Sequence, residues 1–349
     1  MLVNIEDVRR LSDLLSDKRR VVITAHMSPD GDAMGAALGL KHILAENVFS
    51  NDDFSLTVIM PNAAPNFLMW LPGAEDIVVA ENNTEKTAHL LQEAELICVL
   101  DYCESKRAGT ILQPLLENTT KPVLMIDHHI NPGTFAPTLS LSYPQAPATA
   151  FIVLELFNRL VEEGLISRYV LSKDAATCLY TGLMTDTGNF AFNNANMPQL
   201  YRMVAQLLEA GIEKDKIYDN VYNQFSVDRL RFTGYCLYHK MRIFPKYNTA
   251  LIALSSDELR RFNFQSGDAE GIVNMPLQIA SVHYSVFMRE DTDKIKISFR
   301  SQGDRPVNVY AHEIFNGGGH ANAAGGDSTL SLQDTVKRFE DTFRKYFTK

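Results

Sequence analysis

The chain has 349 residues, of which 46% are hydrophobic and 21% charged, so it is long enough for two globular domains with a sizeable core. A formal net charge of -9 argues against a protein that coats long nucleic acid by bulk attraction, but it is compatible with a short anionic substrate. The sequence has no apolar run that could cross a membrane and no signal-peptide pattern, and its four cysteines lack disulfide or metal-ligand spacing, which together predict a reduced, cytoplasmic protein with no membrane partner.

The first 190 residues alternate between strand-like apolar runs and segments with helical periodicity. Strands are expected at residues 21–25, 55–60, 96–100 and 123–126, and helices at 33–46, 148–163 and 173–185. This alternation predicts an α/β fold with a mostly parallel sheet and helices on both of its faces.

The second half of the chain has a different pattern. Residues 197–244 are expected to be helical, with breaks at Gly211 and at 223–226, and Ser226 resembles the cap of a connecting helix that runs to Phe244 before Pro245. Strands are expected at 250–254, 281–288 and 294–299, with a hairpin turn at 289–293 and a final helix at 332–347. The sequence therefore predicts a separate, smaller α+β domain after a helical connector.

Acidic residues and histidines follow the expected strands. They are His26, Asp30 and Asp32 after the first, Asp101 after the third, Asp127, His128 and His129 after the fourth, and Asp186 after a later helix. Because the carboxyl ends of neighbouring parallel strands line one crevice, we expect these groups to meet there. Clustered carboxylates repel unless a cation lies between them, and only Lys106 and Arg107 are close in sequence, so we infer a bound metal.

The mixture of carboxylate and imidazole suits Mn or Mg better than Zn. Two such ions about 3.5–4 Å apart clamp a phosphoryl group and activate water, and this arrangement needs one shared carboxylate. Asp101, which stands alone after its strand, is the candidate for that role. Each motif also has a structural explanation by itself, since Asp30 and Asp32 resemble a turn followed by a helix cap, and Asp101 and Asp186 could cap a turn and a loop.

A glycine-rich segment in the second half is a candidate anion site. Gly317, Gly318 and Gly319 would let the backbone approach a ligand closely and point N–H groups at it, and His320 adds a donor. Arg300, at an expected strand end, could grip a phosphate in a forked geometry. The structural alternative is a flexible glycine loop with a surface arginine. We interpret the remaining histidines as surface or core residues: His42, His89, His239, His283 and His312.

Taken in order, these motifs make the chain resemble the DHH phosphoesterases, named for the run found here as Asp127-His128-His129. The matching motifs are residues 25–35, the strand that ends in Asp101, residues 127–131 and residues 181–190, with a Gly-Gly-Gly-His signature of the DHH-associated domain at 317–320. The resemblance covers essentially the full length. It implies a DHH catalytic metal-binding domain at 1–225, a helical connector at 226–245 and a DHH-associated substrate-binding domain at 246–349.

The resemblance also implies roles for individual residues. One Mn ion would be held by His26, Asp30 and Asp101, and the other by Asp32, Asp101, His128 and Asp186, with Mg or Co as alternative metals. Asp127 would orient a histidine, His129 would face the phosphate and assist the leaving oxygen, and Arg300, Gly318, Gly319 and His320 would hold the terminal nucleotide or phosphate. One departure is Ala36, where many members carry Ser, and it should not remove metal binding.

Within the family, the size and the Gly-Gly-Gly-His signature match the compact group that resembles bifunctional oligoribonucleases. We therefore expect a hydrolase that cleaves short RNA or DNA oligonucleotides (nanoRNA), including dinucleotides, to nucleoside 5′-monophosphates and that dephosphorylates adenosine 3′,5′-bisphosphate (pAp). A phosphodiesterase of cyclic or linear signalling dinucleotides is the alternative enzyme, and a non-catalytic nucleotide sensor is the alternative from another class. The oligomeric state is left open, with a homodimer as one option.

Overall fold

The computed structural model describes residues 2–49, 54–130, 136–166, 170–191, 196–265 and 267–347. It divides into two compact units, residues 1–224 and 225–349. Among the described residues, no helix is long and apolar enough to cross a membrane.

The first unit is built on a six-stranded sheet in the order β3-β2-β1-β4-β5-β6, in which every pairing is parallel. The strands are β1 (Arg20–Thr24), β2 (Ser55–Met60), β3 (Val78–Val79), β4 (Leu96–Leu100), β5 (Val123–Asp127) and β6 (Leu139–Ser142). Each residue of β4 and β5 is buried, which explains their continuous apolar sequences. The predicted parallel sheet is confirmed, and the short edge strands β3 and β6 extend it.

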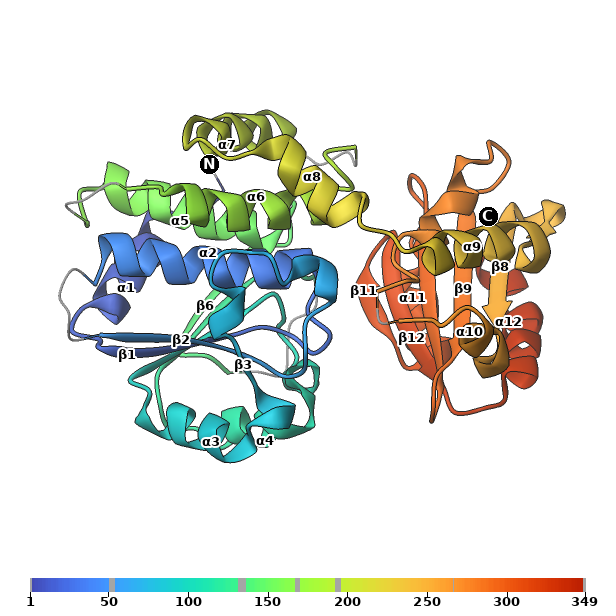
Figure 1. The fold of residues 1–349 in the computed structure, drawn as a ribbon, viewed down its shortest axis with the longest axis horizontal. Helices are drawn as coiled ribbons and strands as arrows, with labels where there is room; N and C mark the ends of the chain where they lie inside the picture. The colour runs from blue at the N-terminus through green and yellow to red at the C-terminus, as the bar shows by residue number, and fades with distance from the viewer. Residues whose placement is uncertain are drawn as a thin grey trace. The chain divides into compact units, whose positions relative to one another are not determined.

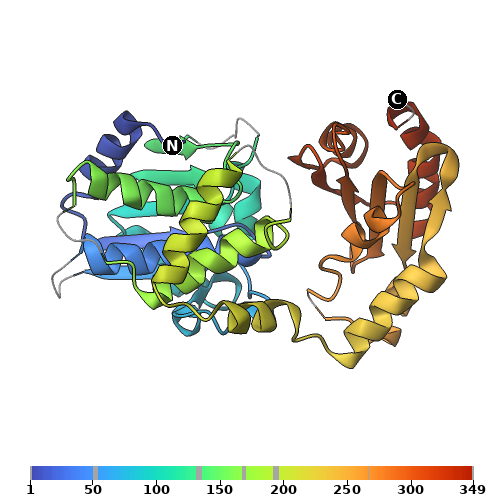
Figure 2. The same ribbon diagram turned by 90° about the horizontal axis from the view of Figure 1, so that it is seen from above.

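Helices cover both faces of this sheet, as predicted (Figure 1). On one face lie α1 (Ile5–Leu15), α2 (Gly31–Asn47), α5 (Thr149–Glu162) and α6 (Lys173–Asp186), with α7 (Met197–Glu209) and α8 (Lys214–Tyr222) beyond them, and on the other lie α3 (Thr84–Glu93) and α4 (Gly109–Glu117). Figure 2 views this unit from the side of α2, α5 and α6, which lie in front of the strands. The sheet is therefore enclosed, and polar groups at its edge can be held away from water.

Glycines allow α2 and α6 to approach closely. A Cβ on Gly35 would lie 2.4 Å from the Cys178 carbonyl oxygen, and one on Gly31 would lie 2.3 Å from Thr185 Oγ1. On α2, these two glycines are one helical turn apart and so face the same neighbour. This contact matters for the site because α2 carries Asp32 in its first turn and α6 ends at Asp186.

The second unit contains a mixed six-stranded sheet in the order β11-β12-β10-β9-β8-β7, in which only β8 and β9 pair in parallel. Its strands are β7 (Arg242–Phe244), β8 (Thr249–Leu254), β9 (Tyr284–Glu290), β10 (Ile295–Ser301), β11 (Gly318–His320) and β12 (Ala323–Ser328). Its helices are α9 (Val227–Tyr235), α10 (Ser256–Arg261), α11 (Asn308–Phe315) and α12 (Leu332–Tyr346). This arrangement confirms the smaller α+β fold.

Alternate residues of this sheet face two apolar clusters. Phe299 packs with Tyr310, Phe315 and Phe339 from α11 and α12 on one face. Phe287 packs on the other face in a cluster that includes Phe232 and Leu259 from α9 and α10. The period-2 pattern that predicted strands at 281–288 and 294–299 thus reflects burial on both faces of the sheet. The observed strands begin and end one to three residues later than predicted.

One prediction and one structural alternative in this unit are wrong. The helix expected to reach Phe244 ends earlier, because α9 passes into a π-helical turn at Cys236–Lys240 and Arg242–Phe244 form β7, whose pairing with β8 outweighs the local helical pattern. The glycine-rich segment, for which the structural alternative was a flexible loop, instead contributes β11 to a hairpin with β12. Glycine is needed there because a Cβ on Gly317 would lie 1.8 Å from the Gly325 carbonyl oxygen. The expected breaks near Gly211 and at 223–226 are confirmed by the ends of α7 and α8.

Candidate metal centre

The loop between β1 and α2 places His26, Asp30 and Asp32. Pro29 precedes the helix, which begins at Gly31, so Asp32 lies in the first helical turn rather than in the loop. Asp30 caps α2, since its Oδ1 accepts hydrogen bonds from the backbone N–H groups of Asp32 and Ala33, each at 3.1 Å. Its Oδ2 lies 3.8 Å from His26 Nε2. The structural and metal-binding explanations of Asp30 are therefore compatible, because Oδ1 caps the helix while Oδ2 is available for a metal ion.

Asp101 lies between two groups of candidate ligands. Its side chain is buried, its Oδ2 lies 3.2 Å from His26 Nε2, and its Oδ1 lies 3.4 Å from His128 Nε2. The backbone of Asp101 has a φ of 66°, a left-handed conformation that costs energy for a residue with a side chain. Conformations of this kind occur where surrounding structure holds a functional group in place. The geometry thus allows the two oxygens of Asp101 to serve two different ions.

The second group is formed by Asp32, His128 and Asp186. His128 Nε2 lies 3.8 Å from Asp32 Oδ2 and 3.4 Å from Asp186 Oδ2. Within this group, and within the group of His26, Asp30 and Asp101, one ligand atom from each residue lies within 4.8 Å of the others. All six predicted metal ligands are therefore brought together in the first unit.

Both ligand histidines are oriented by a backbone carbonyl group that contacts the ring nitrogen Nδ1. Nδ1 of His26 lies 3.0 Å from the Met27 carbonyl oxygen, and Nδ1 of His128 lies 3.3 Å from the Ala146 carbonyl oxygen. A carbonyl can only accept, so each Nδ1 carries the proton and each Nε2 is turned towards the carboxylates, which is the usual arrangement of histidines that bind metal. Nε2 of His26 is buried and lies 3.2 Å from Asp101 Oδ2, so a cation bound by Asp101 would also be within its reach.

The N-terminus of α5 supports the acidic residues and was not identified from the sequence. Backbone N–H groups of Thr149 and Ala150 donate to Asp32 at 2.5 and 2.9 Å, and the Thr149 hydroxyl donates to Asp101 Oδ1 at 2.8 Å. The positive end of a helix and its free N–H groups stabilise buried anions. The only available signal was that the helix expected at 148–163 begins one residue before a hydroxyl side chain.

Burial and mutual repulsion perturb the acidic groups. Burial and the neighbouring Asp101 and Asp186 carboxylates raise the pKa of Asp32 well above its usual range. Burial likewise raises the pKa of Asp186 to about 6. Burial opposes ionisation of Asp101 as well, but hydrogen bonds to His128 and His26 outweigh it and hold its pKa well below the usual range. Without a cation, Asp32 and Asp186 therefore hold their protons to a higher pH than exposed aspartates do, and a divalent ion that binds here would displace these protons.

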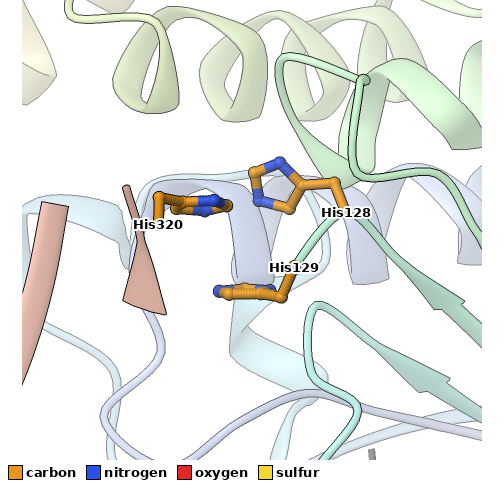
Figure 3. Close-up of side chains that lie close together, drawn as sticks. All are labelled: His128, His129 and His320. Carbon is orange, nitrogen blue, oxygen red and sulfur yellow. The ribbon is translucent and has the colours of Figure 1, made fainter. Parts of the chain in front are cut away.

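Asp127, His129 and Arg107 form a chain of polar contacts beside these ligands. Asp127 Oδ1 lies 2.7 Å from His129 Nδ1, and His129 Nε2 lies 3.0 Å from Arg107 Nη1. The rings of His128 and His129 meet edge to face with centroids 4.9 Å apart (Figure 3). Both residues follow the end of β5, so their side chains need not point in opposite directions as neighbours in a strand do. Asp127 thus contacts the histidine that was expected to face the phosphate.

The predicted substrate residues lie in the second unit. Arg300 of β10 and His320 of β11 are both register partners of Ala323 in β12, so these side chains share one face of the sheet. Gly318 and Gly319 lie in the same short strand as His320, and Gly319 has a φ of 133° that only glycine adopts readily. The second unit thus groups a guanidinium, an imidazole and a glycine-rich strand.

Comparisons with known proteins match each unit separately. Residues 20–183 match the N-terminal domain of the DHH family, and residues 248–349 match the DHHA1 domain. The structure of an exopolyphosphatase-related protein from Bacteroides fragilis is 40% identical with a TM-score of 0.88, and the match covers 99% of this chain and 97% of that one.

Two relatives have more specific names. The bifunctional oligoribonuclease and PAP phosphatase NrnA of Thermus thermophilus is 27% identical over 336 residues, which are 94% of this chain and 90% of that protein. The cyclic-di-AMP phosphodiesterase GdpP of Bacillus subtilis is 25% identical over 97% of this chain but only 49% of its own length. The likeness to NrnA therefore extends over most of both chains, whereas GdpP has a large part without a counterpart here.

Proposed function

We propose a function for this chain from the premise that it belongs to the DHH family of hydrolases and carries a DHHA1 domain. In this proposal, it is a Mn-dependent phosphoesterase that hydrolyses short oligonucleotides to nucleoside 5′-monophosphates and removes the 3′-phosphate of pAp. The near full-length similarity to NrnA supports this choice of substrates. The observation that carries the proposal is the buried Asp101, whose two oxygens each face a different histidine.

The residues present fit a pair of divalent ions. We assign His26, Asp30 and Asp101 to one ion, and Asp32, Asp101, His128 and Asp186 to the other, since oxygen-rich sites with some imidazole suit Mn, with Mg or Co as alternatives. When bound, such ions supply positive charge for the phosphate oxygens and favour deprotonation of the attacking water. The buried His26 Nε2, which lies 3.2 Å from Asp101 and 3.8 Å from Asp30, and the raised pKa of Asp186 support this assignment.

The other polar residues would bind and orient the substrate. We assign to Asp127 the role of orienting His129, on the 2.7 Å contact between them, and to His129 the role of facing the phosphate and assisting the leaving oxygen. Arg300, Gly318, Gly319 and His320 would hold the terminal nucleotide or phosphate, because a forked guanidinium suits phosphate oxygens and glycines let a backbone approach a ligand closely. In this proposal, residues 1–225 form the catalytic domain and residues 246–349 the substrate-binding domain.

Hydrolysis of three substrates tests the proposal. A 5′-labelled RNA dinucleotide, a longer RNA and pAp are each incubated with Mn²⁺ and, separately, with chelator. We expect Mn-dependent cleavage of the dinucleotide and of pAp, and slower attack on the longer strand. Asp101→Asn keeps the shape of the side chain but removes the shared charge, so its turnover should fall by a factor of about 10² to 10³, as for loss of other charge-stabilising groups. Near-normal turnover of Asp101→Asn with Mn²⁺ would exclude the shared-carboxylate role.

The similarity to GdpP supports a second candidate, hydrolysis of cyclic or linear signalling dinucleotides. Competition between cyclic di-AMP and its linear dinucleotide in one reaction decides between the two enzymes. Preference for the cyclic form would favour the second candidate. A non-catalytic sensor would bind these nucleotides with Mn²⁺ but turn over none of them.

A further inference from the structure

Arg107 is a cation that lies next to the candidate metal ligands of the first unit. It lies in a 3₁₀ turn (Ser105–Ala108) and is half-buried. Its carbonyl oxygen accepts a hydrogen bond of 2.7 Å from the backbone N–H of Met27, next to His26. This turn is therefore tied to the loop that carries the first metal ligands, and the position of Arg107 depends on that loop.

The guanidinium of Arg107 is bonded to two neutral acceptors. Nη1 lies 3.0 Å from His129 Nε2 and 3.3 Å from the Asp101 carbonyl oxygen. His129 Nδ1 donates to the Asp127 carboxylate, so Nε2 is the acceptor towards Arg107, which has donors only. The imidazole nitrogen that would face a phosphate is therefore occupied by Arg107 in this structure.

Among the described residues, no carboxylate is in direct contact with the charge of Arg107. Within the described ranges, Arg107 forms no ion pair with an acidic side chain, although the acidic ligands lie nearby. The present bonds join a charged guanidinium to uncharged acceptors, whereas a phosphate is charged and two of its oxygens fit a guanidinium at once. Exchange of the imidazole nitrogen and the carbonyl for phosphate oxygens would therefore be favourable.

We propose that Arg107 binds the non-bridging oxygens of the reacting phosphate and leaves His129 Nε2 when it does so. The inference rests on the proposed function and adds a specificity-determining residue to it. A terminal phosphate monoester carries more negative charge than an internal phosphodiester, so Arg107 contributes more to the binding of pAp than to that of an RNA dinucleotide. His129 Nε2 is released towards the substrate by the same movement.

Binding and turnover of Arg107→Gln, Arg107→Lys and Lys106→Gln test this inference. Lys106 is the matched control, because it lies in the same turn, carries the same charge and pairs with Glu104 at 2.6 Å with an exposed side chain. The probe is adenosine 5′-monophosphate in the presence of Mn²⁺, and its binding is measured by isothermal titration calorimetry. We expect Arg107→Gln to raise its Kd about 10- to 100-fold, which corresponds to one charge-assisted hydrogen bond, with an intermediate rise for Arg107→Lys and less than a twofold change for Lys106→Gln.

The turnover measurements give the specificity. Arg107→Gln should raise KM for pAp more than for the dinucleotide, while its Mn content stays at the wild-type value. Wild-type affinity for adenosine 5′-monophosphate in Arg107→Gln would overturn the inference. A double-mutant cycle with His129→Ala separates direct contact from an effect through His129: loss of the Arg107→Gln effect in that background would also overturn it. Absence of wild-type turnover would refute the proposed function instead, and the binding measurements would still decide the role of Arg107.

Discussion

At the scale of single residues, the site is defined by groups that were visible in the sequence and by others that only the fold reveals. His26, Asp101 and His128 could be selected because each follows an apolar strand, and the parallel sheet brings them to one edge. Thr149 could not be selected, because its contact spans 48 residues of sequence and depends on where α5 begins. Arg107 was noted only as a nearby charge, and its bond to His129 is a tertiary contact.

Thr149 offers a prediction about the orientation of Asp101. Its hydroxyl donates to Asp101 Oδ1 at 2.8 Å from a fully buried position. Thr149→Val keeps the shape but removes the donor, so Asp101 should be less well held and the affinity for Mn²⁺ should fall about 10- to 100-fold, as for other residues that orient metal ligands. Titration of Mn²⁺ followed by electron paramagnetic resonance measures this affinity directly.

Thr149→Ser is the matched control because it retains the hydroxyl. It should bind Mn²⁺ within a few-fold of the wild-type protein. Equal affinity of the Val and Ser variants for Mn²⁺ would show that the hydroxyl does not orient Asp101.

At the scale of elements, the close contact of α2 and α6 sets the distance between Asp32 and Asp186. A Cβ on Gly35 would lie 2.4 Å from a carbonyl oxygen and 2.8 Å from the backbone nitrogen of Gly182. Backbone atoms cannot move aside as a flexible side chain can. The glycine face of α2 therefore determines how near its first turn comes to the end of α6.

Gly35→Ala should consequently destabilise the first unit by about 1–3 kcal/mol, the usual cost of overpacking, and should also weaken Mn²⁺ binding because α2 and α6 are forced apart. Urea denaturation measures the loss of stability. Gly234→Ala is the control, since Gly234 lies within α9 and a Cβ there would meet nothing within 4 Å. That substitution should stabilise the protein by roughly 0.5–1 kcal/mol through helix propensity. A Gly35→Ala variant as stable as the wild-type protein would contradict the packing argument.

The elements also show where prediction from sequence is effective. The central strands β1, β2, β4 and β5 were predicted because buried parallel strands are continuous apolar runs. The two-residue strand β3 is too short to have a pattern of its own. Arg242–Phe244 continued a helical pattern, and their pairing with β8 could not be anticipated from nearby residues. Local sequence patterns therefore predicted the strands whose own residues form a continuous apolar run. They missed the strands whose formation depends on pairing with a distant segment.

At the scale of the whole molecule, the acidic centre links stability to pH and to metal. The pKa of Asp186 is raised by burial to about 6, so the folded protein holds this proton more tightly than the unfolded chain does. An acid with a raised pKa in the folded state favours folding at low pH, and this contribution is lost as the pH rises through about 6. Above that pH the ionised carboxylate destabilises the metal-free protein, and a bound cation compensates for it.

Asp186→Asn should therefore have opposite effects in the two states. At pH 7.5 with chelator, the variant should melt at a higher temperature than the wild-type protein, because a buried, incompletely balanced charge has been removed. With Mn²⁺ the order should reverse, since the wild-type protein gains about 2.7 kcal/mol for each ion at a hundredfold excess over its Kd, whereas the variant has lost a ligand. Differential scanning calorimetry of both proteins in both conditions gives the four values. At pH 5 the difference between the chelated wild-type and variant proteins should be smaller than at pH 7.5, because Asp186 is then largely protonated in the folded protein. A variant that is less stable than the wild-type protein in chelator at pH 7.5 would show that Asp186 stabilises the fold itself, and that metal binding is not the reason for its position.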